Sequence, residues 1–212
     1  GYGGLPPARM IPFPSVPDRL LDGRLTIEPC NEVAEWARSM FLDTAGPLFN
    51  PDHQHLVDAE ADIAFLWTNC ENTKGGKRII GTAGVGQPQG GTPWAKIRAV
   101  EQLLRWFGRI PDFIITLDAT YLKEASAGAI CALVEHELYH CAQAKDRFGD
   151  DRFDRFGEPI WTIRPHDVEE FTGVVKRYGA AAAQIEAFAE SIKNGPMFKD
   201  ADLGGVCGVC HG

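Results

Sequence analysis

The spacing of apolar and polar residues divides most of the chain into short helices and strands. Apolar residues recur at helical spacing in three stretches, which predicts helices with one buried face at 31–42, 93–107 and 127–145. The residues at the starts of these stretches can cap a helix through their side chains: Asn31, Thr92 and Ser126. A further helix is expected to begin at 165–167 and to continue toward residue 193.

Short apolar runs rich in β-branched and aromatic residues predict buried strands. They lie at 63–68, 78–83 and 113–118. The residues between the first two runs include Asn, Lys and two Gly, so we expect a hairpin that pairs these two strands directly. This order of helices and strands predicts a single α+β domain, in which a small mixed sheet packs on helices.

Composition changes toward both ends of the chain. Residues 1–18 contain five prolines, and we expect an extended arm there. Residues 19–194 are expected to form the domain, and 195–212 a glycine-rich tail. We identify no internal repeat in the sequence, so a repeat architecture is not expected.

The bulk composition narrows the class of protein. An apolar share of 44% over 212 residues suits a globular domain with a core. With 29 acidic against 21 basic residues, the net charge of −8 argues against a general affinity for nucleic acid. No apolar run reaches about 18 residues, which argues against a membrane span. Without a signal-peptide pattern, the six cysteines are expected to be reduced thiols and the protein cytoplasmic.

One pattern in the 127–145 helix points to chemistry, the sequence His136-Glu137-x-x-His140. Residues four apart share one face of a helix, so both imidazoles can bind one metal ion, and Zn²⁺ suits them. Glu137 can take a proton from a water molecule that the metal activates. The motif predicts a zinc-dependent hydrolase, usually a peptidase. Apolar neighbours place the motif in a half-buried helix, where polar side chains need partners.

A zinc site of this kind needs a third protein ligand, which we expect on a later segment. His166 is the first choice and would give a three-histidine site. Glu170 and then Glu169 are the alternatives, and either would give a site of two histidines and one glutamate. Tyr139, Tyr178 and Arg164 are candidates to donate a hydrogen bond to the oxyanion that forms during peptide hydrolysis.

The other histidines and cysteines give weaker signals. Cys207, Cys210 and His211 form Cys-x-x-Cys-His, the pattern of a haem attachment site, but haem attachment requires export. The same three residues could instead hold a second, structural zinc, or form part of a reduced tail without a role. His53 and His55 are two apart, which places them on different faces of a helix, and we expect both at the surface.

Two segments carry a resemblance to a known family. They are FIITLDATYLKEASAGAICALVEHELYHC at 113–141 and PHDVEEFTGVVKRYGA at 165–180. The chain resembles the putative phage metallopeptidases, zincin-type proteins of phages and prophages, from about residue 16 to 178. It is more distantly similar to SprT-like and ImmA/IrrE-type zincins, although the third ligand lies further from His140 than in SprT-like proteins.

The resemblance implies a zincin-like fold with the motif helix in the core, in the cytoplasm of a bacterial host. It implies that His136 and His140 bind zinc and that Glu137 is the base, and it leaves the third ligand and the substrate open. By analogy with zincins, the strand at 113–118 would lie at the edge of the cleft and bind substrate as an added strand. Its apolar composition fits a central core strand equally well.

Two functions of different class remain open from the sequence. The first is a zinc metallopeptidase that hydrolyses peptide bonds in a protein or peptide substrate. The second is a zincin-fold protein-binding module with a structural zinc and no protease activity. Glu137 favours the enzyme, because a purely structural site has no need of a base.

Overall fold

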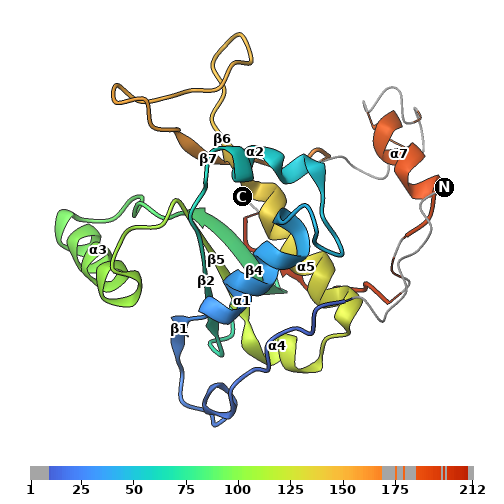
Figure 1. The fold of residues 1–212 in the computed structure, drawn as a ribbon. Coiled ribbons are helices and arrows are strands. Elements are labelled where there is room, and N and C mark those ends of the chain that lie inside the picture. The colour runs from blue at the N-terminus through green and yellow to red at the C-terminus, as the bar shows by residue number, and fades with distance from the viewer. Residues whose placement is uncertain are drawn as a thin grey trace.

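The computed structural model describes residues 10–168, 175, 179, 185–196, 198 and 200–209 (Figure 1). Several positions named above lie outside the described residues: Glu169, Glu170, Tyr178, Cys210 and His211. About half of the helix expected between 165 and 193 also falls outside them. Within the described part, α7 (Glu186–Lys193) is helical.

A mixed sheet forms the centre of the domain. Among the described residues its strands run in the order β1-β2-β5-β4-β3, and β8 also pairs with β4. β2 is parallel to β5, and β4 is antiparallel to β5. The strands are β1 (Ile27–Pro29), β2 (Ile63–Thr68), β3 (Thr73–Lys74), β4 (Lys77–Val85), β5 (Phe113–Asp118) and β8 (Val206–Cys207).

The three predicted strands are present, but the predicted hairpin is wrong. β5 lies between β2 and β4, so these two strands do not pair with each other. Phe113, Ile115 and Leu117 of β5 are at most 1% exposed. A strand this apolar is stabilised most in the centre of a sheet, where strands pair with both its edges and helices cover its apolar face. β5 is therefore a core strand and offers no free edge to a substrate.

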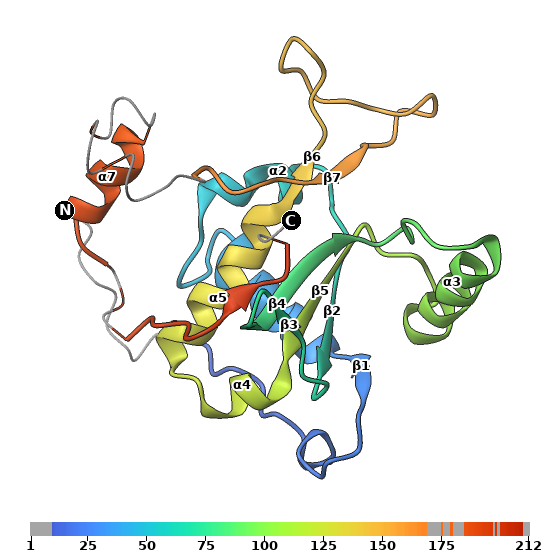
Figure 2. The same ribbon diagram turned by 180° about the vertical axis from the view of Figure 1, so that it is seen from behind.

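Helices cover one face of this sheet. Figures 1 and 2 show α1 and α5 on the same side, where α1 contacts β2 and α5 contacts β4. α3 projects away from the sheet. The helices are α1 (Asn31–Ala37), which continues into a π-helical turn at Arg38–Leu42, α2 (Gln54–Asp58), α3 (Pro93–Phe107), α4 (Ala119–Glu124) and α5 (Ala127–His140). Short 3₁₀ turns lie at Asp18–Leu20 and Pro51–His53.

Two of the three predicted caps are present. Thr92 Oγ1 accepts a hydrogen bond from the Ala95 N–H, and Ser126 Oγ accepts one from the Ala129 N–H. The cap expected at Asn31 is wrong, because Cys30 occupies the N-cap position of α1 and makes no side-chain cap bond. The N-cap residue lies just before the first helical residue and has a non-helical backbone. Asn31 is already the first residue of α1, so it cannot occupy the cap position.

α5 lies in the core, as the resemblance implies, and it ends earlier than predicted. Leu133, Val134 and Leu138 are at most 1% exposed. The helix stops at His140 rather than near 145, because the chain becomes extended as β6 (Cys141–Gln143) and pairs with β7 (Trp161–Ile163). This pairing returns the chain to the end of α5. None of the described helices is both long and apolar enough to cross a membrane.

Between β6 and β7 the chain contains a short internal repeat that the sequence analysis missed. Residues 146–150 (DRFGD) and 154–158 (DRFGE) form the same turn. In each, the first Asp accepts hydrogen bonds through Oδ1 from the N–H groups of the third and fifth residues. In each, the Arg guanidinium carbon also lies 4.5 or 4.7 Å from the centre of the Phe ring. The expectation that the chain has no repeat is therefore corrected.

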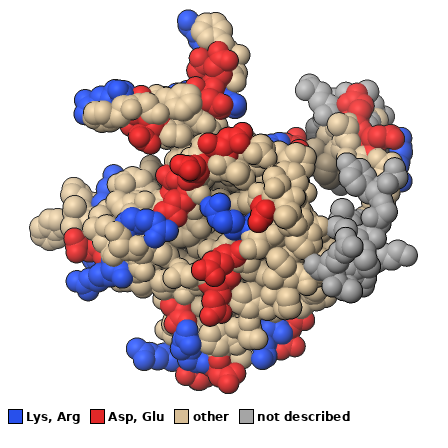
Figure 3. Space-filling view, in the orientation of Figure 1, with Lys and Arg blue, Asp and Glu red and all other residues tan. Residues whose placement is uncertain are grey.

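Acidic and basic side chains are interspersed over the face seen in Figure 3. A broad surface of one sign is what attracts nucleic acid over long distances. The low affinity for nucleic acid that the net charge predicts stays a prediction.

Candidate metal centre

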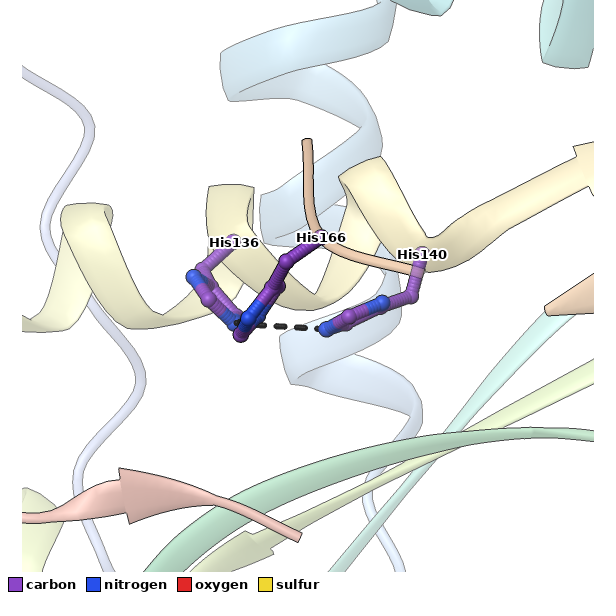
Figure 4. Close-up of side chains that lie close together, drawn as sticks. All are labelled: His136, His140 and His166. Atoms are coloured by element: carbon purple, nitrogen blue, oxygen red, sulfur yellow. Dashed lines mark hydrogen bonds between the residues drawn. The ribbon is translucent and has the colours of Figure 1, made fainter. Parts of the chain in front are cut away.

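α5 places His136 and His140 on one face, one turn apart. Their Nε2 atoms lie 3.3 Å from each other, and Figure 4 shows both rings directed to the same side of the helix. This arrangement follows from the helical period alone, because residues four apart lie one above the other.

His166 reaches the same place from a different segment. Its Nε2 atom lies 3.1 Å from Nε2 of His136, and its ring stacks on that of His140 with 5.1 Å between ring centres. The residue follows β7 in an irregular stretch, so the helix start expected at 165–167 is wrong as far as the described residues extend. The β6–β7 pairing and a hydrogen bond from the Arg164 N–H to the His140 carbonyl hold this stretch against the end of α5.

The hydrogen bond on the far side of His140 fixes the tautomer of its ring. Nδ1 lies 2.6 Å from the Arg164 carbonyl oxygen, which can only accept, so Nδ1 carries the proton. In the neutral ring, Nε2 then presents its lone pair to the other histidines. Histidines that bind metals are commonly oriented in this way by a backbone carbonyl.

The three histidines fit a divalent metal ion. A tetrahedral zinc ion with Zn–N bonds of about 2.05 Å separates two nitrogen ligands by about 3.3 Å. The distances of 3.1 and 3.3 Å found here match that spacing, and the three rings form a group able to hold a metal. Burial lowers the pKa of His136 to about 4, and it also lowers the pKa of His140, so both rings are neutral donors near pH 7.

Glu137 lies beside this group, and its side chain is fully buried. Burial raises the pKa of its carboxyl group to about 7, although hydrogen bonds from Cys207 and from the Ala83 backbone act in the opposite direction. Its Oε1 atom has no hydrogen-bond partner among the described residues. A buried carboxylate oxygen without a partner is costly, so this position suits a group that exchanges a proton with a small molecule.

These side chains now support a family assignment. Residues 34–193, about three quarters of the chain, match the model of a family described as putative phage metallopeptidase. The chain belongs to this family. No curated protein and no solved structure matches it. The resemblance stated from the sequence is thereby confirmed.

In this metallopeptidase family member, Cys207 also lies at the histidine group. Its Sγ atom is 3.4 Å from Nε2 of His140 and 3.4 Å from Oε2 of Glu137. The sequence analysis left Cys207, Cys210 and His211 open between a second metal site and a reduced tail without a role, and Cys210 and His211 lie outside the described part. The only sequence signal for the observed position is that Cys207 lies among closely spaced glycines, which permit close approach of one backbone to another.

A pocket of about 690 Å³ opens beside the three histidines and is lined in part by Tyr139, Arg164 and Phe188. The Tyr139 hydroxyl donates to Asp52 over 2.7 Å and accepts from Asn50, so its donor already has a partner. The Arg164 guanidinium pairs with Asp167. Tyr139 and Arg164, the two candidate oxyanion donors within the described residues, therefore line the pocket, and both already interact with other side chains.

The two remaining histidines of the described part lie apart from this group. His53 is 1% exposed, so the expectation of a surface residue is wrong for it. The 3₁₀ turn at Pro51–His53 directs its ring inward, against the ring of Tyr139 and 3.6 Å from a carboxylate oxygen of Glu135. His55 is exposed as expected, and its Nε2 atom lies 3.0 Å from the Cys141 carbonyl.

Proposed function

We propose that this member of the family is a zinc-dependent peptidase that hydrolyses peptide bonds in a protein substrate, with Glu137 as the general base. The observation that carries the proposal is the convergence of three imidazole Nε2 atoms beside a fully buried carboxyl group. Zinc fits the nitrogen ligands and their spacing better than metals that prefer oxygen ligands. Because related proteins belong to phages, a protein in the cytoplasm of the bacterial host is the expected substrate.

Each residue of the site has a separate part in this reaction. His136, His140 and His166 would hold the metal ion. When bound, the metal supplies Lewis acidity, which activates water and polarises the scissile carbonyl. Glu137 takes the proton from the attacking water and gives it to the leaving amine. The pocket of about 690 Å³ beside the histidines would receive the substrate.

A second function has one observation in its favour. Cys207 lies next to His140, and metal sites closed by four protein ligands are usually structural. On this alternative the chain is a zincin-fold module that binds another protein and cleaves nothing. The buried carboxyl group of Glu137 favours the peptidase, because a structural site gains nothing from an acid that is costly to bury.

The substitution Glu137→Gln separates the two functions. We expect it to retain the metal and to lower the rate of peptide hydrolysis by roughly 10²–10⁴-fold, because an amide cannot accept the proton. Cleavage of a denatured protein is followed by mass spectrometry, and metal content by elemental analysis.

Glu135→Gln is the matched control, since Glu135 lies on the same helix and its carboxylate accepts a hydrogen bond from Asn50, which an amide oxygen can also do. This variant should cleave at the wild-type rate. Full cleavage by Glu137→Gln would exclude Glu137 as the base. A chain that binds metal but cleaves no substrate would favour the binding module.

A further inference from the structure

The segment 200–209 runs along the metal centre from a distant part of the chain. Figure 2 shows it, in red, beside β4 and below α5. Residues 206–207 form β8, which is parallel to β4 and pairs Cys207 with Gly81. The Gly208 N–H donates to the Gly81 carbonyl over 2.7 Å. At its other end, the Asp200 carbonyl accepts a hydrogen bond from Ser126 Oγ at the start of α5.

The glycines of this segment permit its close approach to β4. A Cβ atom at Gly205 would lie 2.6 Å from Cγ2 of Ile80, and one at Gly208 would lie 3.0 Å from Cβ of Thr82. Separations of this size would force the backbones of β8 and β4 apart. Gly205 and Gly208 therefore let the segment pack closely on β4, and this packing fixes the position of Cys207 against the sheet.

The Cys207 sulfur lies beside the three histidines, where it forms a group able to hold a metal with His136 and Glu137. With a Zn–S bond of about 2.3 Å, a tetrahedral zinc ion places a sulfur ligand about 3.6 Å from each nitrogen ligand. The observed distance from Sγ to Nε2 of His140 is 3.4 Å. The Val209 N–H also donates to Sγ over 3.3 Å, as it would to a negatively charged sulfur. Glu137, fully buried and with Oε1 lacking a hydrogen-bond partner, lies on the other side of the sulfur.

We propose that the Cys207 thiolate is the fourth protein ligand of the three-histidine metal centre, and that residues 200–209 thereby hold the centre closed in the resting chain. A thiolate bound to the metal would leave the thiol proton to Oε2 of Glu137, which lies 3.4 Å from Sγ. The sulfur would then take the fourth position on the metal. This inference rests on the metal-binding part of the proposed function.

The same segment also covers the outer edge of β4. β5 pairs with one edge of β4, and β8 pairs with the other beside Gly81. An exposed strand edge next to a peptidase centre is where an extended peptide can add to the sheet. Residues 200–209 therefore occupy both the metal position and the strand edge that an extended substrate would use. The centre opens when this segment leaves β4.

Cobalt spectroscopy of the full chain tests the proposal without relying on activity. Co²⁺ is loaded in place of zinc, and we expect the near-ultraviolet charge-transfer absorption of a cobalt–thiolate bond in the wild type. Cys207→Ser should lose this absorption and retain one cobalt ion per chain, held by the three histidines. The zinc affinity of this variant should fall by at least about 10-fold. Loss of a residue that only hydrogen-bonds to a metal ligand already lowers the affinity by that factor.

Two control substitutions identify the sulfur. Cys70→Ser removes an exposed thiol outside the candidate metal groups, and Cys210→Ser removes the other cysteine of the Cys-x-x-Cys pattern. Both should retain the charge-transfer absorption. Absorption that persists in Cys207→Ser, or that is lost in Cys210→Ser alone, would overturn the assignment to Cys207.

Gly205→Val tests the packing of residues 200–209 against β4 without changing Cys207. Because its side chain would meet Ile80, we expect weaker charge-transfer absorption together with faster alkylation of Cys207 by iodoacetamide. Absorption and alkylation equal to those of the wild type would contradict the inference that packing of β8 on β4 positions Cys207.

Activity then shows whether the closed centre restrains the peptidase. If a tenth or less of the resting chains are open, Cys207→Ser should raise the rate of peptide hydrolysis by at least about 10-fold. A chain that binds cobalt through the histidines without a thiolate band would refute this inference and leave the proposed function intact. A chain that binds no cobalt would refute both.

Discussion

Gly81 makes room for the carboxylate of Glu137 against β4. A Cβ atom at this position would lie 2.8 Å from Oε1 of Glu137 and 2.9 Å from Cδ1 of Leu133. Both neighbours are buried in a packed region, so neither can move without disturbing others. The absence of a side chain at this one position of β4 thus lets α5 approach the sheet with Glu137 and Leu133 facing inward.

Gly81→Ala should therefore destabilise the fold and misplace the base. We expect a loss of about 1–3 kcal/mol in the free energy of unfolding, the usual cost of an added group in a filled core, together with a lower rate of hydrolysis. Gly84→Ala is the control, because Gly84 lies in the same strand and a Cβ there would meet nothing within 4 Å. Its stability should stay within about 0.5 kcal/mol of the wild type. Urea unfolding measures both, and equal stability of the two variants would contradict the close approach at Gly81.

At the scale of elements, the N-terminus of α5 joins the motif helix to the segment 200–209. Ser126 Oγ accepts from the Ala129 N–H and donates to the Asp200 carbonyl. One hydroxyl group therefore caps the helix that carries the histidines and holds the segment that carries Cys207. Thr92 caps α3 in the same way through the Ala95 N–H, and the structure gives its hydroxyl no contact with residues 200–209.

Ser126→Ala and Thr92→Ala should thus differ in one respect. Each removes a helix cap and is expected to lower the free energy of unfolding by about 1 kcal/mol. Ser126→Ala alone should also increase hydrogen exchange at the backbone amides of residues 204–209, since it removes an anchor of that segment. Hydrogen-exchange mass spectrometry compares the two variants. Equal exchange in this segment would show that Ser126 does not anchor it.

At the scale of the whole molecule, three parts of the chain that are distant in sequence meet at the candidate metal centre. Its histidines come from α5 and from the stretch after β7, and Cys207 comes from β8. A metal ion bound by the folded chain alone stabilises it by about 2.7 kcal/mol at 100 times its dissociation constant. Removal of the metal should therefore loosen these three parts together.

We expect chelation of zinc to lower the Tm by roughly 5–10 °C, given about 2–4 °C per kcal/mol for a chain of this size. Differential scanning calorimetry of the full chain, with and without a chelator, measures the shift. His136→Ala should abolish the shift, whereas His55→Ala, which changes an exposed histidine outside the centre, should preserve it. A chelator effect of the same size in His136→Ala would show that the metal binds elsewhere.

Much of the local structure was predictable from the sequence. The strands at Ile63–Thr68 and Phe113–Asp118 and the helix at Pro93–Phe107 have the predicted bounds. The shared face of His136 and His140 also follows from the sequence. These features depend on interactions between residues a few positions apart, which periodicity and capping side chains encode directly.

Tertiary structure alone decided how these elements meet. The sequence did not reveal that β5 separates β2 from β4, that α5 ends at His140, or that Cys207 reaches the histidines. Each of these depends on contacts between residues 18 or more positions apart. The free energy of such contacts is a sum over many side chains and backbone hydrogen bonds. A local pattern shows which side of a strand or helix is apolar and must be buried. Several other elements of the chain could cover that side. Only the folded chain selects the partner that packs best.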